Sequence, residues 1–323
     1  MQSKRIVAIS AARLIAMLMI ITCHILQYYH LELAWWFNVG VQIFLIISGF
    51  LSGTLEISNP IDWLKRRFIR VLIPFYSGLL IYLIICKIFT IELSVVEVLK
   101  SVFTLGNLPG LQHLWFVSHI LFCYVITPYL YELGKKFNGN IIIIGLLLCI
   151  YIIISSIINA HFSHHIICCY ILGFYLGYIY GKSSSKDILM SRIALFVSLI
   201  AALLNVARII LKYAYPEWMT YAPSQLWVAY SNYSHVLLGA ALFAILFKLF
   251  HNAKYNCLLE ISDKYSYEIY LTHHLLILSP FTLMSLSKST YLNIIIVLVG
   301  TVLLSVILQK IAMFIETSLI TKK

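Results

Sequence analysis

The guanidinium of Arg13 and the imidazole of His24 lie at the two ends of one apolar run near the start of the chain. Eleven residues bring a helix back to within ~20° of its starting direction, so both side chains share one face, about 16 Å apart. A bare arginine in hydrocarbon costs about 3 kcal/mol or more, which favours a position facing protein or a wet cavity. The pair therefore indicates a functional site inside a membrane helix. The alternative is that Arg13 reaches the inner interface while His24 lies at the outer one, without shared chemistry.

A second group of ionisable residues places four cations within six positions, Lys65, Arg66, Arg67 and Arg70. Guanidinium groups bind phosphate oxygens two at a time, so this cluster suits an anionic ligand such as a nucleotide phosphate. The alternative is a cytoplasmic basic cluster that contacts only anionic lipid headgroups. Both interpretations place the cluster at the cytoplasmic mouth of a membrane span.

Three further segments carry polar side chains in apolar surroundings. Ser48 follows a glycine-containing stretch, and its hydroxyl can bond across closely packed helices. His113 and Trp115 open a later apolar span. Glu268 needs a partner or water inside a membrane helix, and its spacing of five residues from His273 keeps the two from sharing a face closely.

Composition predicts the elements that position these residues. The chain is 62% hydrophobic and 11% charged, with a mean hydropathy of +0.94, whereas soluble domains carry about 25% charged residues. A water-soluble globule is therefore excluded. The apolar residues form blocks of about 20, which suit membrane helices and not the alternating segments of a barrel. We predict an all-α polytopic membrane protein with ten spans, at roughly residues 6–28, 36–57, 70–91, 111–131, 140–160, 165–181, 190–212, 226–250, 266–285 and 290–315.

The positive charges predict the orientation of these spans. If the N-terminus is cytoplasmic, 17 of the 23 Lys and Arg residues lie on the inner side: Lys4, Arg5, Lys65, Arg66, Arg67, Arg70, Lys135, Lys136, Lys182, Lys186, Arg192, Lys248, Lys254, Lys264, Lys310, Lys322 and Lys323. Five lie on the outer side: Lys87, Lys100, Arg208, Lys212 and Lys288. The positive-inside rule then predicts that both termini are cytoplasmic. Because this bias explains the net charge of +11, nucleic acid is not an expected partner.

Short connections predict a single domain over residues 1–323, without a cleaved signal peptide or a fused extracellular domain. The seven cysteines form no metal-type spacing with neighbouring histidines, so we interpret them as packing residues. The connection 160–165 contains three histidines and no carboxylate, which is weak evidence for metal binding. No metal site is expected.

Together these residues resemble the acyltransferase 3 family of bacterial integral-membrane acyltransferases. Arg13 and His24 match the arginine and histidine of the family's first helix. Later blocks match in order, namely Gly40, Phe44, Ser48, Gly49 and Phe50, then Arg67, Arg70 and Pro74, then His113 and Trp115, and finally Ser266, Tyr267, Tyr270, Leu271 and His273. The resemblance covers nearly the whole chain, although no single block is specific. Leu45 departs from the pattern, and Ser10 stands where many members carry an aspartate, so Arg13 must find another anion, for which the donor is one candidate.

The resemblance implies transfer of an acyl group, usually acetyl, from acyl-CoA to a surface polysaccharide or its lipid-linked precursor at the bacterial inner membrane. Acyl-CoA is a co-substrate, and no permanently bound cofactor is expected. Arg66, Arg67 and Arg70 would hold the CoA phosphates. His24 would act as general base or transient acyl carrier, and Arg13 would orient the donor or stabilise the oxyanion. Residues expected to shape the acceptor side or to give substrate or structural support are His113, Trp115, Ser48, Glu268, Tyr270 and His273.

Transport is the alternative function. A ten-helix protein with a polar interior could move a lipid-linked sugar or a polysaccharide across the membrane, and it would need no CoA site. Such transporters typically show paired halves with interrupted helices, and the sequence offers no such pairing. A receptor is not supported, because the sequence predicts no cytoplasmic signalling domain.

Overall fold

The computed structural model describes residues 7–136, 168–183, 188–217 and 224–320, with positions 147, 150, 151, 153, 154 and 157. Within this part of the chain every regular element is a helix, as the sequence predicts. The chain divides into two compact units. The first unit comprises Met1–Ala16, Asn38–Ile57 and Ile126–Tyr255, and the second comprises Met17–Phe37, Ser58–Val125 and Asn256–Lys323. The predicted connection 160–165 lies outside the described residues.

Two helices, α1 (Val7–Tyr28) and α6 (Trp115–Lys136), contribute residues to both units. The other helices of the first unit are α3 (Val39–Gly53), α8 (Cys168–Lys182), α9 (Ile188–Ala214) and α11 (Ser224–Leu249). Those of the second unit are α2 (Ala34–Phe37), α4 (Pro60–Ile88), α5 (Val95–Val102), the 3-10 turn η1 (Gln112–Leu114), α12 (Cys257–Ile277) and α13 (Thr290–Ile320).

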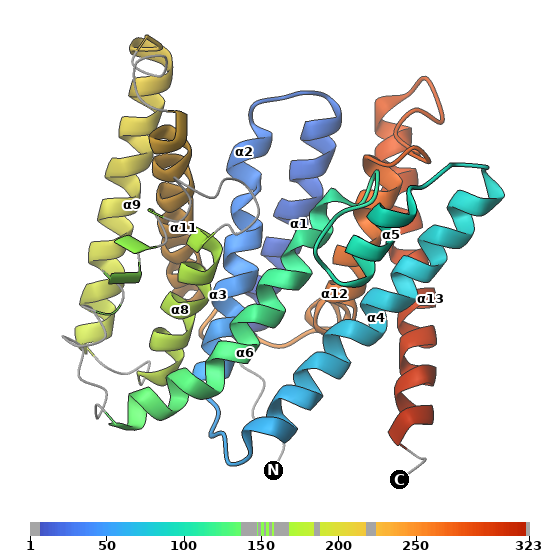
Figure 1. Cartoon of the computed structure of the whole chain (residues 1–323). Coiled ribbons are helices and arrows are strands. Elements are labelled where there is room, and N and C mark those ends of the chain that lie inside the picture. Colours follow the sequence, from blue (N-terminus) through green and yellow to red (C-terminus); the bar gives the residue numbers. More distant parts are fainter. Residues whose placement is uncertain are drawn as a thin grey trace. The chain divides into compact units, whose positions relative to one another are not determined.

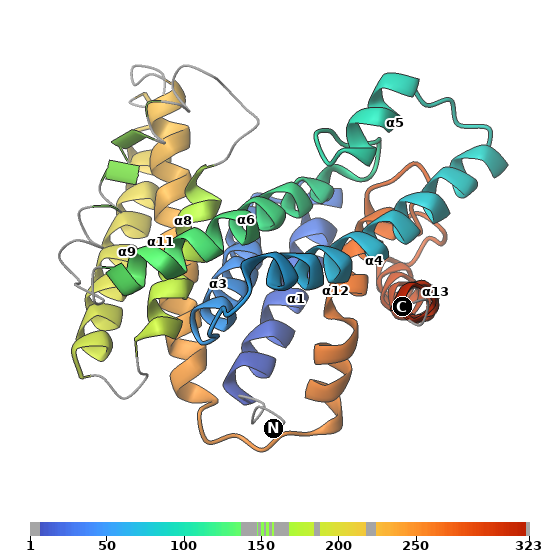
Figure 2. The ribbon, with the colours of Figure 1, turned by 60° about the horizontal axis from the view of Figure 1, so that its bottom comes forward.

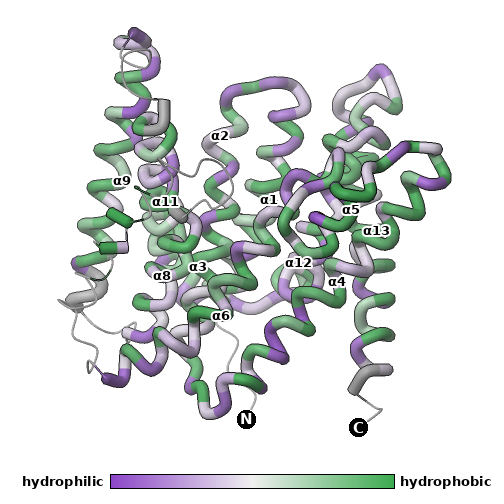
Figure 3. Tube along the Cα trace, in the orientation of Figure 1, coloured by the Kyte–Doolittle hydropathy of each residue, from purple (hydrophilic) through white to green (hydrophobic). Residues whose placement is uncertain are grey.

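Seven helical segments of the described residues are long and apolar enough to cross a membrane: Val7–Tyr28, Ala34–Gly53, Pro60–Ile88, Gln112–Lys136, Arg192–Ala214, Leu226–Leu249 and Thr290–Ser318. Figure 3 shows apolar residues along most of the length of α9 and α13. The predicted span 165–181 overlaps α8, which has only 15 residues. The predicted span 266–285 is displaced from the more polar α12, which begins at Cys257 and ends at Ile277. The predicted span 140–160 falls mostly outside the described residues. The count of ten and the orientation remain predictions.

In the first unit, α3 packs against α8 through glycines spaced four residues apart, and α9 packs against α11 (Figure 1). A Cβ atom on Gly177 would lie 2.0 Å from the carbonyl oxygen of Ile46, and one on Gly49 would lie 1.9 Å from that of Phe174. No Cβ fits at such distances, so only glycine permits this approach of the two backbones. Gly49 in the Ser48 block of the sequence is therefore explained by helix packing.

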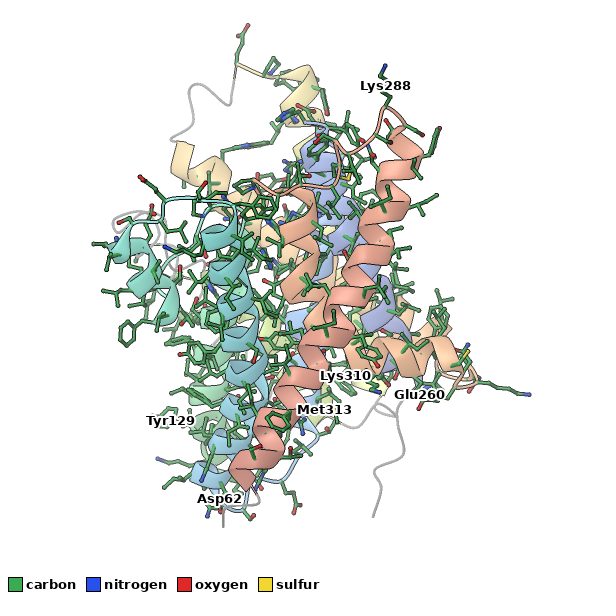
Figure 4. All side chains as sticks on the ribbon, turned by 90° about the vertical axis from the view of Figure 1, so that its right-hand side faces the viewer. Asp62, Tyr129, Glu260, Lys288, Lys310 and Met313 are labelled. Atoms are coloured by element: carbon green, nitrogen blue, oxygen red, sulfur yellow. The ribbon has the colours of Figure 1, made fainter. Side chains whose placement is uncertain are left out.

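In the second unit, α12 and α4 both pack against α13, and α4 also contacts α12 (Figure 2). Helix α4 begins at a proline, and the side chain of Asn59 caps it by accepting hydrogen bonds from the backbone N–H groups of Ile61 and Asp62. Within the bundle, a 2.8 Å hydrogen bond joins the hydroxyls of Thr272 on α12 and Ser305 on α13. Figure 4 shows Lys288 just before the first turn of α13 and Lys310 and Met313 in the second half of this helix.

The connection between α5 and α6 is held to the rest of the second unit by two close contacts. The hydroxyl of Tyr82 donates a hydrogen bond to the carbonyl oxygen of Pro109. Gly110 has a φ of +76°, and a Cβ atom there would lie 2.5 Å from Ser279. Glycine therefore suits both the left-handed backbone and the close contact at this point. This segment delivers His113, in η1, to the interior of the unit.

Candidate functional site

Four imidazole rings meet inside the second unit, from His24 on α1, His113 on η1, and His273 and His274 on α12. Their exposed fractions are 9%, 4%, 0% and 3%, so all four are buried. The six distances between ring centroids run from 4.5 to 6.4 Å. The rings of His113 and His274 stack at 4.5 Å with an interplanar angle of 16°, and His24 lies 4.6 Å from His274. We call these four side chains the histidine cluster.

Helix α12 holds His113 in this cluster through two contacts with the preceding connection. The hydroxyl of Tyr270 donates to the carbonyl oxygen of His113, and the two rings lie 5.1 Å apart. The Nδ1–H of His274 donates to the carbonyl oxygen of Gly110 at 2.7 Å. Because His273, Tyr270 and His274 lie within about one turn of α12, one helix both supplies two of the rings and positions a third.

The hydrogen bonds assign a tautomer to three of the four rings. Nδ1 of His273 lies 2.9 Å from the carbonyl oxygen of Ile269, and Nδ1 of His274 faces the carbonyl oxygen of Gly110. A carbonyl oxygen only accepts, so each Nδ1 carries the proton and each Nε2 carries a lone pair. Nδ1 of His24 lies 2.6 Å from the amide oxygen of Gln27, which assigns the same tautomer to His24.

The Nε2 atoms differ in accessibility. Both ring nitrogens of His113 and Nε2 of His273 are fully buried and have no hydrogen-bond partner among the described residues. Nε2 of His24 and Nε2 of His274 do not belong to this fully buried set, and no protein hydrogen bond occupies them. The Nε2 atoms of His24 and His274 are therefore less enclosed than these three nitrogens, although both side chains are buried.

The histidine cluster lacks the carboxylate partner that often accompanies a histidine acting as a base, among the described residues. Among the described residues, no carboxylate forms an ion pair with any of the four rings. Among the described residues, the only side-chain hydrogen bond of a cluster ring runs from Nδ1–H of His24 to the neutral amide oxygen of Gln27. No group of three or more His, Cys, Asp or Glu side chains in the described ranges is arranged to hold a metal ion. The cluster is thus four imidazole rings without a carboxylate partner among the described residues.

The predicted phosphate-binding arginines lie on α4. The Arg67 guanidinium is half-buried and lies 5.2 Å from the ring centroid of Trp63 and 5.5 Å from that of Tyr124. These aromatic faces attract the cation and fix its position. Arg66 and Arg70 are exposed. One guanidinium is therefore held in place and two are free to reach toward a ligand or a lipid headgroup.

Two tyrosines on α12 connect this part of α4 to the histidine cluster. The carbonyl oxygen of Val71, one turn after Arg67, accepts a hydrogen bond from the hydroxyl of Tyr267 at 3.0 Å. The Tyr267 ring lies parallel to that of Tyr270 at 6.4 Å, and Tyr270 contacts His113. A continuous series of contacts thus runs from the arginine segment to the cluster within the second unit.

Comparison with known proteins decides the family. A family model described as an acyltransferase domain matches residues 6–310, which is nearly the whole chain. The chain belongs to the acyltransferase 3 family. The predicted resemblance is therefore confirmed, and membership supports acyltransferase activity in a multi-pass membrane protein. No curated protein and no solved structure matches the chain.

Of the residues singled out by the acyltransferase 3 pattern, His24, His113 and His273 come together in the cluster, and the Tyr270 ring contacts His113 and His273. Trp115 follows His113 by two residues and begins α6. Its carbonyl oxygen accepts a 2.8 Å hydrogen bond from Nδ1 of His119.

The other predicted residues lie elsewhere. Glu268 is buried on α12, with an exposed fraction of 8%. Arg13 and Ser48 are half-buried and belong to the first unit, so the cavity predicted for Arg13 and His24 remains a prediction.

Sequence reasoning missed His274 and Gln27. The family block ends at His273, so nothing in the pattern points to the next residue. Gln27 lies three residues after His24, a spacing that puts two helical side chains in contact, and this signal was available in the sequence.

Proposed function

We propose that this protein transfers an acyl group, with acetyl expected, from acyl-CoA to a hydroxyl of a cell-surface polysaccharide or its lipid-linked precursor at the bacterial cell membrane. The observation that carries the proposal is the state of His24. The family pattern selects this residue, its Nδ1–H is engaged by Gln27, and its Nε2 carries a lone pair that no described residue binds. This is the arrangement that a general base toward a hydroxyl requires.

The donor would bind along the contacts between α4 and α12. The CoA phosphates are anionic, and Arg66, Arg67 and Arg70 offer three guanidinium groups within five residues. Arg67 lies against two aromatic rings, which lowers the entropy lost when it binds a phosphate. The series of contacts through Tyr267 and Tyr270 supports a thioester end placed at the histidine cluster.

In the proposed reaction, Nε2 of His24 takes the proton of the acceptor hydroxyl while the hydroxyl oxygen attacks the thioester carbonyl carbon. The tetrahedral intermediate then breaks its C–S bond, and the thiolate of CoA leaves with the electron pair. Gln27 keeps the ring in the tautomer that leaves Nε2 unprotonated. For Arg13, the family pattern supports a role in orienting the donor or stabilising the oxyanion.

The test measures transfer of radiolabelled acetyl from acetyl-CoA to envelope glycan in membranes of the producing cell. His24→Ala is expected to lower transfer by about 10²–10⁴-fold, the usual contribution of an acid–base group. The matched control is His251→Ala, because His251 is an exposed histidine of the first unit. Wild-type transfer by inserted His24→Ala protein would contradict the assignment.

A further inference from the structure

A protonated His24 would have no counter-charge in the structure. Its Nδ1 is bound by the neutral Gln27 amide, and none of its described contacts is a carboxylate. In serine hydrolases a buried aspartate stabilises the imidazolium that forms when histidine acts as base. An unpaired buried cation is costly, so a base in this position needs another way to disperse or pass on the proton.

His274 is the best placed group to take that proton. Its ring is the nearest of the cluster to His24, at 4.6 Å, compared with 5.1 Å for His273 and 6.4 Å for His113. Its Nδ1–H is committed to the carbonyl oxygen of Gly110, so its Nε2 holds the lone pair. That Nε2, like the Nε2 of His24, is not among the fully enclosed ring nitrogens, and no described residue binds it.

We propose that His274 is a second acid–base residue of the site, which receives from His24 the proton of the acceptor hydroxyl and delivers it to the departing sulfur. This inference rests on the proposed acyl transfer. The hydroxyl proton moves to Nε2 of His24 as the C–O bond forms. The C–S bond then breaks, its electron pair stays on sulfur, and the proton moves through Nε2 of His274 to give the CoA thiol. Atoms and charge balance without another reactant.

The neighbouring rings support this role for His274. His113 stacks flat on its ring at 4.5 Å and fixes the ring plane. The carbonyl of Gly110 accepts its Nδ1–H and so prevents the tautomer in which Nε2 is protonated.

The experiment uses a variant of His274 that keeps the hydrogen bond made by Nδ1 and removes the base at Nε2. In His274→Asn the side-chain amide can still donate to Gly110, as Nδ1–H does, but the base at Nε2 is lost. Radiolabelled acetyl transfer to envelope glycan is expected to fall about 100-fold, with unchanged affinity for acetyl-CoA. The matched control is His119→Asn, because His119 also donates Nδ1–H to a backbone carbonyl in the same unit. Transfer by the control is expected to stay within about twofold.

A second substitution tests the physical reason. Gln27→Glu places a carboxylate on Nδ1 of His24, and Gln27 is exposed, so the charge is tolerated. Adding Gln27→Glu to His274→Asn is expected to raise transfer about 10-fold above that of His274→Asn alone. The reason is that a His24 imidazolium stabilised by a carboxylate depends less on residue 274. If His274→Asn does not fold, His274→Gln replaces it in the same pair.

The outcomes are distinct. Loss of transfer in His274→Asn with recovery on adding Gln27→Glu supports the inference. Wild-type transfer by His274→Asn overturns it, and so does a loss that Gln27→Glu does not repair, since that result assigns His274 to holding Gly110. If wild-type protein itself transfers no acetyl group, the proposed function fails, and the two failures are thereby separated.

Discussion

The glycine interface of α3 and α8 in the first unit and the histidine cluster of the second are both buried, yet they are built in opposite ways. At the glycine interface the backbones approach so closely that a single Cβ atom does not fit. In the cluster, three ring nitrogens are buried without any partner among the described residues. Buried polar atoms are normally satisfied, and exceptions gather at functional sites. Gln42 on α3 and Tyr178 on α8 also carry buried polar atoms without a partner among the described residues, so the cluster is distinguished by its four converging imidazole rings and not by unsatisfied atoms alone.

The largest effect is expected at the glycine interface. The Cβ atom that Gly177→Ala adds would lie 2.0 Å from the carbonyl oxygen of Ile46, so the two helices must move apart. We expect a loss of about 3 kcal/mol or more in the free energy of unfolding. Gly134→Ala is the matched control, because no atom lies within 4 Å of its added Cβ. Thermal unfolding of both proteins in detergent checks this, and equal midpoints would remove the packing argument.

A substitution in the histidine cluster should raise the free energy of unfolding, whereas Gly177→Ala lowers it. His113→Leu replaces two unpartnered nitrogens with an apolar side chain of similar size, so we expect a gain of about 1–2 kcal/mol in the free energy of unfolding. Acetyl transfer should nevertheless fall at least about 10-fold. Thermal unfolding and the radiolabelled transfer assay are run on the same preparation. A destabilised protein with full transfer would erase the contrast between the two regions.

The arginine segment gives a smaller, binding-only effect. Arg67→Ala combined with Arg70→Ala is expected to weaken acetyl-CoA binding about 10-fold or more, since two charge-assisted contacts to phosphate are lost. Lys248→Ala with Lys254→Ala removes the same charge from exposed positions of the first unit and serves as control. Isothermal titration measures both dissociation constants. Equal values would favour the interpretation that the arginines contact lipid headgroups.

The smallest effect is expected for the tyrosine link between α12 and α4. Tyr267→Phe removes the hydrogen bond to the Val71 carbonyl but keeps the ring, so the loss should be about 1 kcal/mol. Tyr291→Phe is the control, because that side chain is 82% exposed. The midpoints of thermal unfolding are compared. A loss as large as that of Gly177→Ala would mean that the link carries more of the fold than its single bond suggests.

Sequence predicted the class of fold and part of the site, and the reasons for the limits are physical. Apolar block length identifies helices, but α8 is short and α12 is polar, so hydropathy alone does not fix how many helices cross the membrane. The family pattern selects His24, His113 and His273, because their residue types and order are visible.

Tertiary contacts were beyond reach. The meeting of η1 with α12 depends on bonds from Tyr270 and His274 to backbone carbonyls, which no side-chain pattern records. His274 was missed for this reason. The predicted partnership of Arg13 with His24 relied on helical spacing alone, which places two side chains on a face but not in a common cavity.

The central claim is that the donor's acyl end reacts at the histidine cluster. A structure of the protein bound to acetonyl-CoA, a thioether analogue that cannot transfer its acyl group, tests this directly. We predict its carbonyl carbon within about 6 Å of Nε2 of His24, the sum of one hydrogen bond and one attack distance, with its diphosphate against Arg67. An analogue whose carbonyl lies away from the four rings, or whose phosphates contact other residues, would contradict the account.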